Sequence, residues 1–167
     1  MRILYIIILL LTLASCVNQP NYLEHALKAA GTNRPELEKV LAHYKGDTLK
    51  YKAAVFLIEN MPGHYSYAGD KVLEYYALGE KILQSELTPV QQRDSLLNIS
   101  DTQFPGLAQN TVSDIEIMQA AYLINNIDAA FELWETKPWA QHLSFEQFCE
   151  YLLPYKCVEL QQLDHWR

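Results

Sequence analysis

The sequence predicts an all-α fold, a compact orthogonal or antiparallel array of about six helices that follows a signal peptide. Three observations support this prediction. Apolar residues recur at helical spacing through most of the chain, helix start and stop residues flank these stretches, and no strand-type alternation, internal repeat or low-complexity tract interrupts them. The residues that follow position 15 are numerous enough for one domain with a real core.

The N-terminal segment has the layout of a secretory signal. Arg2 precedes an apolar run over residues 3–13, and a Leu-Ala-Ser-Cys sequence then ends at Cys16. This sequence resembles a bacterial lipobox, in which the cysteine is lipidated and becomes the first mature residue. We therefore expect a signal peptide over residues 1–15, lipid on Cys16 and a linker over residues 16–20.

Two other interpretations of the N-terminal segment are open. One is a buried N-terminal helix with an ordinary cysteine. The other is a membrane-spanning anchor, which requires about 20 apolar residues. The apolar run ends earlier, at Asn18-Gln19-Pro20, so lipidation is the interpretation that we favour.

The charge of the chain argues against nucleic acid as a partner. The formal net charge is −7 for the whole sequence. Phosphate binding requires clustered Lys and Arg residues, and the sequence has no such cluster. We expect no nucleic-acid partner.

The first helices are predicted from their start and stop residues. Residues 23–30 carry apolar side chains at helical spacing before a glycine, and residues 33–46 begin with a capping box and end at another glycine. A third helix is expected over residues 48–60, where the centre is apolar on all sides. We expect Phe56 and Leu57 of this helix at the centre of the fold, with a buried strand as the alternative.

The remaining helices follow an irregular aromatic segment at residues 61–67, where proline and glycine end the third helix. Start signals of the form Thr-Pro-x-Gln and Ser-x-x-Glu/Gln recur in the second half of the chain. We expect helices from about residue 70, from residue 88, from 113 to about 135 and from 144 to just before 154, with a loop at 100–111.

Few residues offer catalytic chemistry. His64 lies in the irregular segment, and loops carry functional residues more often than helix faces do; a structural role for this histidine is the interpretation that we favour, with catalysis as the alternative. Cys149 lies on an apolar helical face and is interpreted as a core residue, whereas Cys157 could be a free thiol. No phosphate-binding glycine loop or zinc motif is present in the sequence, so we expect no metal or cofactor.

Several segments resemble a known family. They are residues 33–44 (NRPELEKVLAHY), 53–66 (AAVFLIENMPGHYS), 121–131 (AYLINNIDAAF), Pro138-Trp139, 144–156 (SFEQFCEYLLPYK) and 163–167 (LDHWR). With the lipobox, they look like the N-terminal helical region of transglutaminase-like lipoproteins of the Bacteroidetes. The resemblance covers nearly the whole mature chain, although residues 157–162 lack a proline that is typical of the family.

The resemblance implies that a second domain, and not the helical region, carries the catalytic activity. In such proteins a papain-like transglutaminase core with a Cys/His/Asp triad follows the helical region, and it would begin after Arg167. No triad residue is therefore assigned here, neither Cys149 nor Cys157 is expected to be a nucleophile, and we expect this chain alone not to be an enzyme.

We thus expect residues 21–167 to form a non-catalytic helical domain in the bacterial cell envelope, on the periplasmic or surface face. It would be held at the membrane through Cys16 and would pack against or position a transglutaminase-like domain. The alternative is a stand-alone lipoprotein that binds envelope glycan or peptide. If the domain evolved beside a catalytic domain, we expect residues 61–67 and 154–167 to form an uncovered surface; the alternative is that Trp166 folds back onto the helices and seals the domain. The groove or interface candidates are His64, Tyr65, Tyr67, Trp139, Tyr155 and Trp166.

Overall fold

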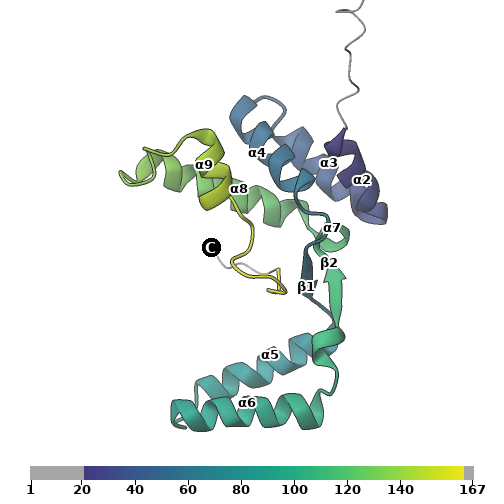
Figure 1. Cartoon of the computed structure of the whole chain (residues 1–167), viewed down its shortest axis with the longest axis vertical. Coiled ribbons are helices and arrows are strands. Elements are labelled where there is room, and N and C mark those ends of the chain that lie inside the picture. Colours follow the sequence, from purple (N-terminus) through teal and green to yellow (C-terminus); the bar gives the residue numbers. More distant parts are fainter. Residues whose placement is uncertain (1–20, 164–167) are drawn as a thin grey trace, which may run out of the picture.

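The computed structural model describes residues 21–163, which form a helical body and a projecting arm of two helices (Figure 1). The all-α prediction is confirmed, because these residues form eight α-helices and one small sheet. No helix within them is long and apolar enough to cross a membrane. The α-helices are α2 (Tyr22–Ala29), α3 (Arg34–His43), α4 (Thr48–Glu59), α5 (Asp70–Leu83), α6 (Pro89–Gln103), α7 (Asp114–Ile117), α8 (Ala120–Thr136) and α9 (Phe145–Tyr151).

Helices α2, α3 and α4 form the first part of the body, close to the positions predicted. Asp47 caps α4 by accepting hydrogen bonds from the backbone N–H groups of Leu49 and Lys50. Leu57 is buried as expected. The prediction for Phe56 is wrong, because α4 buries one face only and Phe56, on its flank, is partly buried against the core.

Helices α8 and α9 complete the core of the body. Helix α8 packs against α3 and α4, and an aromatic cluster joins α8 to α9. The ring of Phe148 stacks on Trp134 at a centroid distance of 4.4 Å and meets the edge of Phe131 at 4.7 Å. Phe148 is fully buried, so this cluster fixes α9 against the body.

The single helix predicted over residues 113–135 is wrong, because the chain breaks between α7 and α8. Hydrogen bonds from another helix stabilise the break. The side-chain amide of Asn33 donates to the carbonyls of Ile115 and Met118, and Glu36 accepts from the backbone N–H of Ala120. These contacts satisfy backbone groups that the break releases, and they depend on residues more than 80 positions away in the sequence.

A small antiparallel sheet stands at the base of the arm. Strands β1 (Tyr65–Tyr67) and β2 (Thr111–Ser113) pair with Ser66 opposite Val112, and Leu160 forms a parallel bridge with Ser66 on the other edge of β1. The sequence shows no strand-type alternation in these segments, because strands of three residues are too short to show an alternating pattern.

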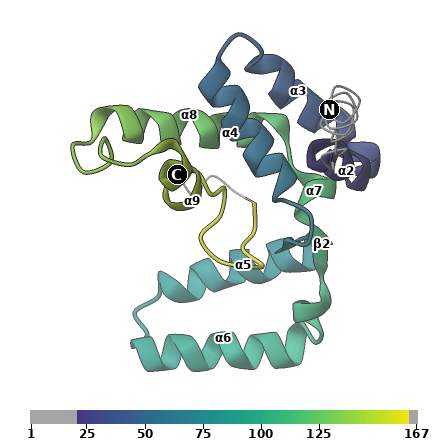
Figure 2. The same ribbon diagram turned by 45° about the horizontal axis from the view of Figure 1, so that its top comes forward.

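Helices α5 and α6 form the arm, which projects from the body in two views (Figures 1 and 2). The predicted capping box of Thr88 and Gln91 is present at the start of α6. Helix α6 continues to Gln103, so the predicted loop begins later than expected. At the base, the backbone N–H of Ala68 donates to the carbonyl of Asn110, which brings the two ends of the arm together beside the sheet.

Candidate functional site

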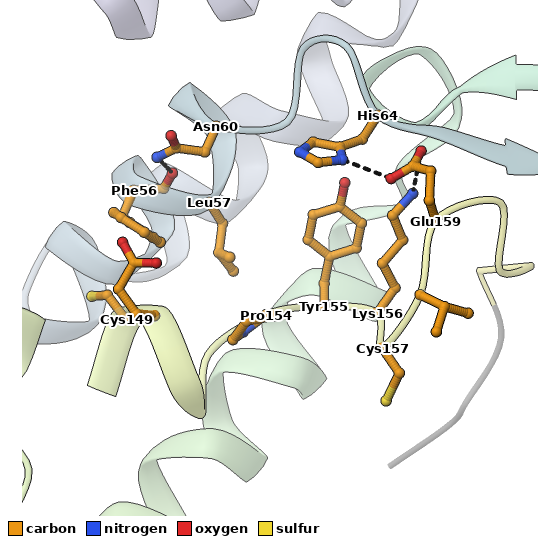
Figure 3. A pocket seen from close by; sticks show the side chains of 12 residues that line it. Phe56, Leu57, Asn60, His64, Cys149, Pro154, Tyr155, Lys156, Cys157 and Glu159 are labelled. Carbon is orange, nitrogen blue, oxygen red and sulfur yellow. Dashed lines mark hydrogen bonds and ion pairs between the residues drawn. The ribbon is translucent and has the colours of Figure 1, made fainter. Parts of the chain in front are cut away.

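A cavity of about 380 Å³ opens between α4, α9 and the segment that follows α9 (Figure 3). We call residues 154–163 the strap, because they cross the body and reach the outer edge of β1. Phe56, Leu57 and Pro154 supply apolar surface to the cavity, and His64 and Glu159 supply polar groups. Its volume falls within the usual range of small-ligand sites, about 300–1,000 Å³.

A buried carboxylate fixes the first part of the strap. Asp114, at the start of α7, is fully buried and accepts hydrogen bonds from the hydroxyls of Ser66 and Tyr155. Its Oδ2 atom also lies 2.6 Å from Nζ of Lys156, whose side chain is only 8% exposed. A buried ion pair requires such additional hydrogen bonds to offset the loss of hydration, and here they come from β1 and the strap.

Hydrogen bonds from α8 also hold the strap and the residue before it. Asn126 donates its side-chain amide to the carbonyl of Leu153, and the hydroxyl of Tyr122 donates to the carbonyl of Tyr155. Burial raises the pKa of the Tyr155 hydroxyl, and its hydrogen bond to Asp114 raises it further. Tyr155 therefore stays neutral and acts as a hydrogen-bond donor in this site.

The rim of the cavity carries a carboxylate–histidine pair. Oε2 of Glu159 lies 2.9 Å from Nδ1 of His64, while Oε1 accepts a hydrogen bond from the backbone N–H of Tyr65 and lies 3.2 Å from Nζ of Lys156. The other ring nitrogen of His64 points toward Asn60 (Figure 3). A carboxylate that orients one nitrogen of a histidine leaves the other free to meet a ligand.

Acid should loosen this pair. Desolvation raises the pKa of Glu159, but hydrogen bonds from His64, Tyr65 and Lys156 outweigh it and lower the pKa to about 2. An unfolded Glu titrates near pH 4.3, so the unfolded chain binds the proton first. The stability that Glu159 contributes is thus present above about pH 4.3 and lost as the pH falls toward 2.

We therefore expect the free energy of unfolding to depend less on pH, at acid pH, in Glu159→Gln than in the wild type. The free energy of unfolding, measured with urea between about pH 5 and pH 2.5, should fall more steeply for the wild type than for the variant. Glu86→Gln, in the exposed α5–α6 turn, is the matched control and should keep the wild-type slope. Equal slopes for wild type and Glu159→Gln would contradict the role given to this carboxylate.

The two described cysteines differ in environment, and both are free. Cys149 is buried on α9 across the cavity from His64, and desolvation together with Glu146 and Glu150 raises the pKa of its thiol to about 11. A high pKa makes a poor nucleophile. Cys157 is exposed on the strap, with its sulfur pointing away from His64 (Figure 3).

Thiol labelling should separate these cysteines. In folded protein carrying Cys16→Ala, we expect a maleimide to modify Cys157 rapidly and Cys149 only after unfolding, because burial and a raised pKa both slow the reaction of Cys149. Cys157→Ser should abolish the rapid phase. Rapid reaction of two thiols per folded chain would instead show that the packing between α4 and α9 opens readily and exposes Cys149.

The structure brings together part of the predicted interface set. His64 and Tyr155 both line the cavity, whereas Trp139 is exposed in the turn after α8. Tyr65 is exposed and Tyr67 half-buried on β1. The expectation of an uncovered surface is wrong for the start of the strap, since Tyr155 is buried. Cys16 and Trp166 lie outside the described residues.

Sequence reasoning missed the residues that hold the site together. No local pattern in the sequence assigns Asp114, Lys156 or Glu159 to a site. Asp114 bonds Tyr155, 41 positions away, and Glu159 bonds His64, 95 positions away. The one local signal was the combination of Tyr155 with Lys156 and Glu159 next to a proline that ends a helix.

The described residues contain no group of three or more His, Cys, Asp or Glu side chains arranged to hold a metal ion. No family model, curated protein or solved structure shows significant similarity to the chain.

Proposed function

We propose that this chain is a lipid-anchored, non-catalytic helical domain of the bacterial cell envelope that packs against and positions a transglutaminase-like domain. The observation that carries the proposal is the fixation of the strap. The Asp114–Lys156 pair, the α8 hydrogen bonds and the Leu160 bridge hold it to the body. A domain connected through such a strap would keep one position beside the cavity. A flexible linker would instead allow the domain many positions and orientations relative to the helical body.

Sequencing the gene beyond codon 167 tests the arrangement of the two domains. We expect the frame to continue into a region with the Cys, His and Asp motifs of a transglutaminase-like core. With that region expressed together with residues 17–167, Lys156→Met should loosen the connection, which small-angle scattering would record as a larger radius of gyration. A stop codon after position 167, with no such gene beside it, would contradict the proposal.

Membrane anchoring has its own test, motivated by the Leu-Ala-Ser-Cys sequence. We expect the wild-type chain to fractionate with membranes after a high-salt wash and to partition into detergent, because two or more acyl chains anchor stably. Cys16→Ala should release it, whereas the matched variant Cys157→Ala should stay bound. If Cys16→Ala remained entirely with membranes, lipidation of this cysteine would not be the anchor.

The cavity favours a second candidate function, a stand-alone lipoprotein that binds envelope glycan or peptide. Apolar surface beside an oriented histidine is typical of small-ligand sites. Titration of residues 17–167 with a soluble disaccharide-peptide fragment of peptidoglycan would test it by calorimetry. His64→Ala should weaken binding, and Trp139→Ala, on an exposed turn outside the cavity, should not; absence of heat for the wild type would contradict this function.

A further inference from the structure

The turn between α3 and α4 and the residues beside it form an amphipathic corner of the body. A groove of about 550 Å³ lies along this corner, and Leu41 and Tyr51 supply apolar surface to it. Lys45 and Lys52 line the same groove and are exposed. Neither lysine belongs to the ion pairs formed within the described residues, although Lys52 has a weak Coulomb attraction to Glu146. The corner therefore carries two ammonium groups that are not held in an ion pair by this part of the chain.

The charge of this corner is opposite to that of the whole chain. Residues 39–52 contain four lysines and one aspartate, whereas the formal net charge of the chain is −7. Two of these lysines are paired within the body, and the aspartate, Asp47, accepts hydrogen bonds at the start of α4. Lys45 and Lys52 have no basic neighbours in the sequence, so the fold gathers them at one groove. A partner of the corner should therefore be anionic.

Exposed apolar side chains beside these lysines indicate which anionic partner fits. Leu49 and Tyr51, both in the first turn of α4, are 45% and 36% exposed. A lysine keeps its alkyl stem on apolar surface while its ammonium group reaches water, and tyrosine is enriched at the boundary between lipid and water. A nucleic acid would require more basic contacts to phosphates than this corner offers. The surface of an anionic membrane supplies both the charge and the apolar phase that these side chains match.

The start of the described chain lies at the same end of the molecule. Helix α2 begins at the end opposite the arm, and the α3–α4 turn lies at that end as well (Figures 1 and 2). The stretch of backbone from Cys16 to Asn21 can span at most about 18 Å. A lipid on Cys16 would therefore hold the start of α2, and with it this corner, close to the membrane surface.

We propose that residues 41–52 lie against the headgroups of an anionic membrane and orient the anchored domain. This inference rests on the lipidation of Cys16 proposed above, which supplies a membrane attachment that two lysines alone would not. Attraction to acidic lipids is lost beyond a Debye length, about 10 Å at 0.1 M salt, so Lys45 and Lys52 act only when the corner faces the surface. The arm then points away from the membrane.

Fluorescence quenching in vesicles tests this orientation. The lipidated chain would be reconstituted into vesicles of phosphatidylglycerol and phosphatidylcholine that contain a lipid with a spin label on its headgroup. In a Cys157→Ser background, a fluorophore on Leu49→Cys should lose most of its emission, whereas a fluorophore on Leu97→Cys, in the arm, should keep its emission. Both leucines are exposed and Cys149 is buried, so the fluorophore attaches to the introduced cysteine.

Charge reversal tests the part played by the lysines. Lys45→Glu combined with Lys52→Glu should restore the emission at position 49, while the lipidated chain still floats with the vesicles. The matched pair Lys71→Glu and Lys81→Glu makes the same change in net charge on α5 and should leave the quenching as in the wild type. All four lysines are exposed, and circular dichroism would show that both double variants remain folded.

Flotation with the vesicles separates the orientation from the anchoring on which it rests. A wild-type chain that does not float has no anchor, and this result would overturn the anchoring and the orientation together. A chain that floats but is quenched equally at positions 49 and 97 would overturn the orientation alone. Restored emission with both pairs of lysine substitutions would also overturn it, because net charge and not this corner would then govern the contact.

Discussion

Asp114→Ala is expected to destabilise the domain by about 3–5 kcal/mol. The substitution removes the buried carboxylate partner of Lys156, which keeps only the half-exposed Glu159 as a counter-charge, and leaves the hydroxyls of Ser66 and Tyr155 without this acceptor. Breaking a buried ion pair by removing one partner costs far more than the pair itself contributes. Urea unfolding followed by circular dichroism would measure the change.

Two further variants make this result interpretable. Asp94→Ala removes an exposed carboxylate whose partner is Arg93, and such a pair is worth about 0–1 kcal/mol. Adding Lys156→Met to Asp114→Ala should restore part of the lost stability, because the nearly buried ammonium that has lost its buried partner disappears. If Asp114→Ala cost no more than Asp94→Ala, the buried pair would not hold the strap.

Phe148→Ala is the second substitution with a large expected effect, a loss of about 3–5 kcal/mol. The ring is fully buried between Trp134 and Phe131, and alanine would leave a cavity where α9 meets α8. The same unfolding measurement applies. Because a domain of this kind has roughly 5–15 kcal/mol in total, the variant should be near the limit of folding.

The matched control lies on the same helix. Tyr151→Ala also removes an aromatic ring from α9, but Tyr151 is exposed, so we expect a change within about 0.5 kcal/mol. Phe56→Ala should fall between the two, since Phe56 is partly buried. Equal losses for Phe148→Ala and Tyr151→Ala would mean that α9 does not pack as described.

The sequence predicted those elements whose signals are local. Capping residues such as Asp47 and Thr88 marked the starts of α4 and α6, and the structure has both caps. The break between α7 and α8 was missed, because it depends on Asn33 and Glu36 reaching across from the start of α3. A start signal at residue 113 cannot reveal that a distant side chain will end the same helix after one turn.

The site was less predictable than the fold for the same reason. His64 could be singled out because proline and glycine place it in an irregular segment, and Tyr155 because it follows a helix-ending proline. The groups that join them, Asp114 and Glu159, look like ordinary surface carboxylates in the sequence. Burial gives Asp114 its role, and burial depends on tertiary contacts that local spacing does not encode.

The arm has a consequence for the order of folding. The body is made from two chain segments, before Ala68 and after Asn110, that meet at β1 and β2. Closing a flexible loop of roughly 40 residues costs about 3 kcal/mol of entropy. An early α5–α6 hairpin brings those ends together through local contacts and removes much of this cost. Changes in the arm should therefore slow the assembly of a core that they do not touch.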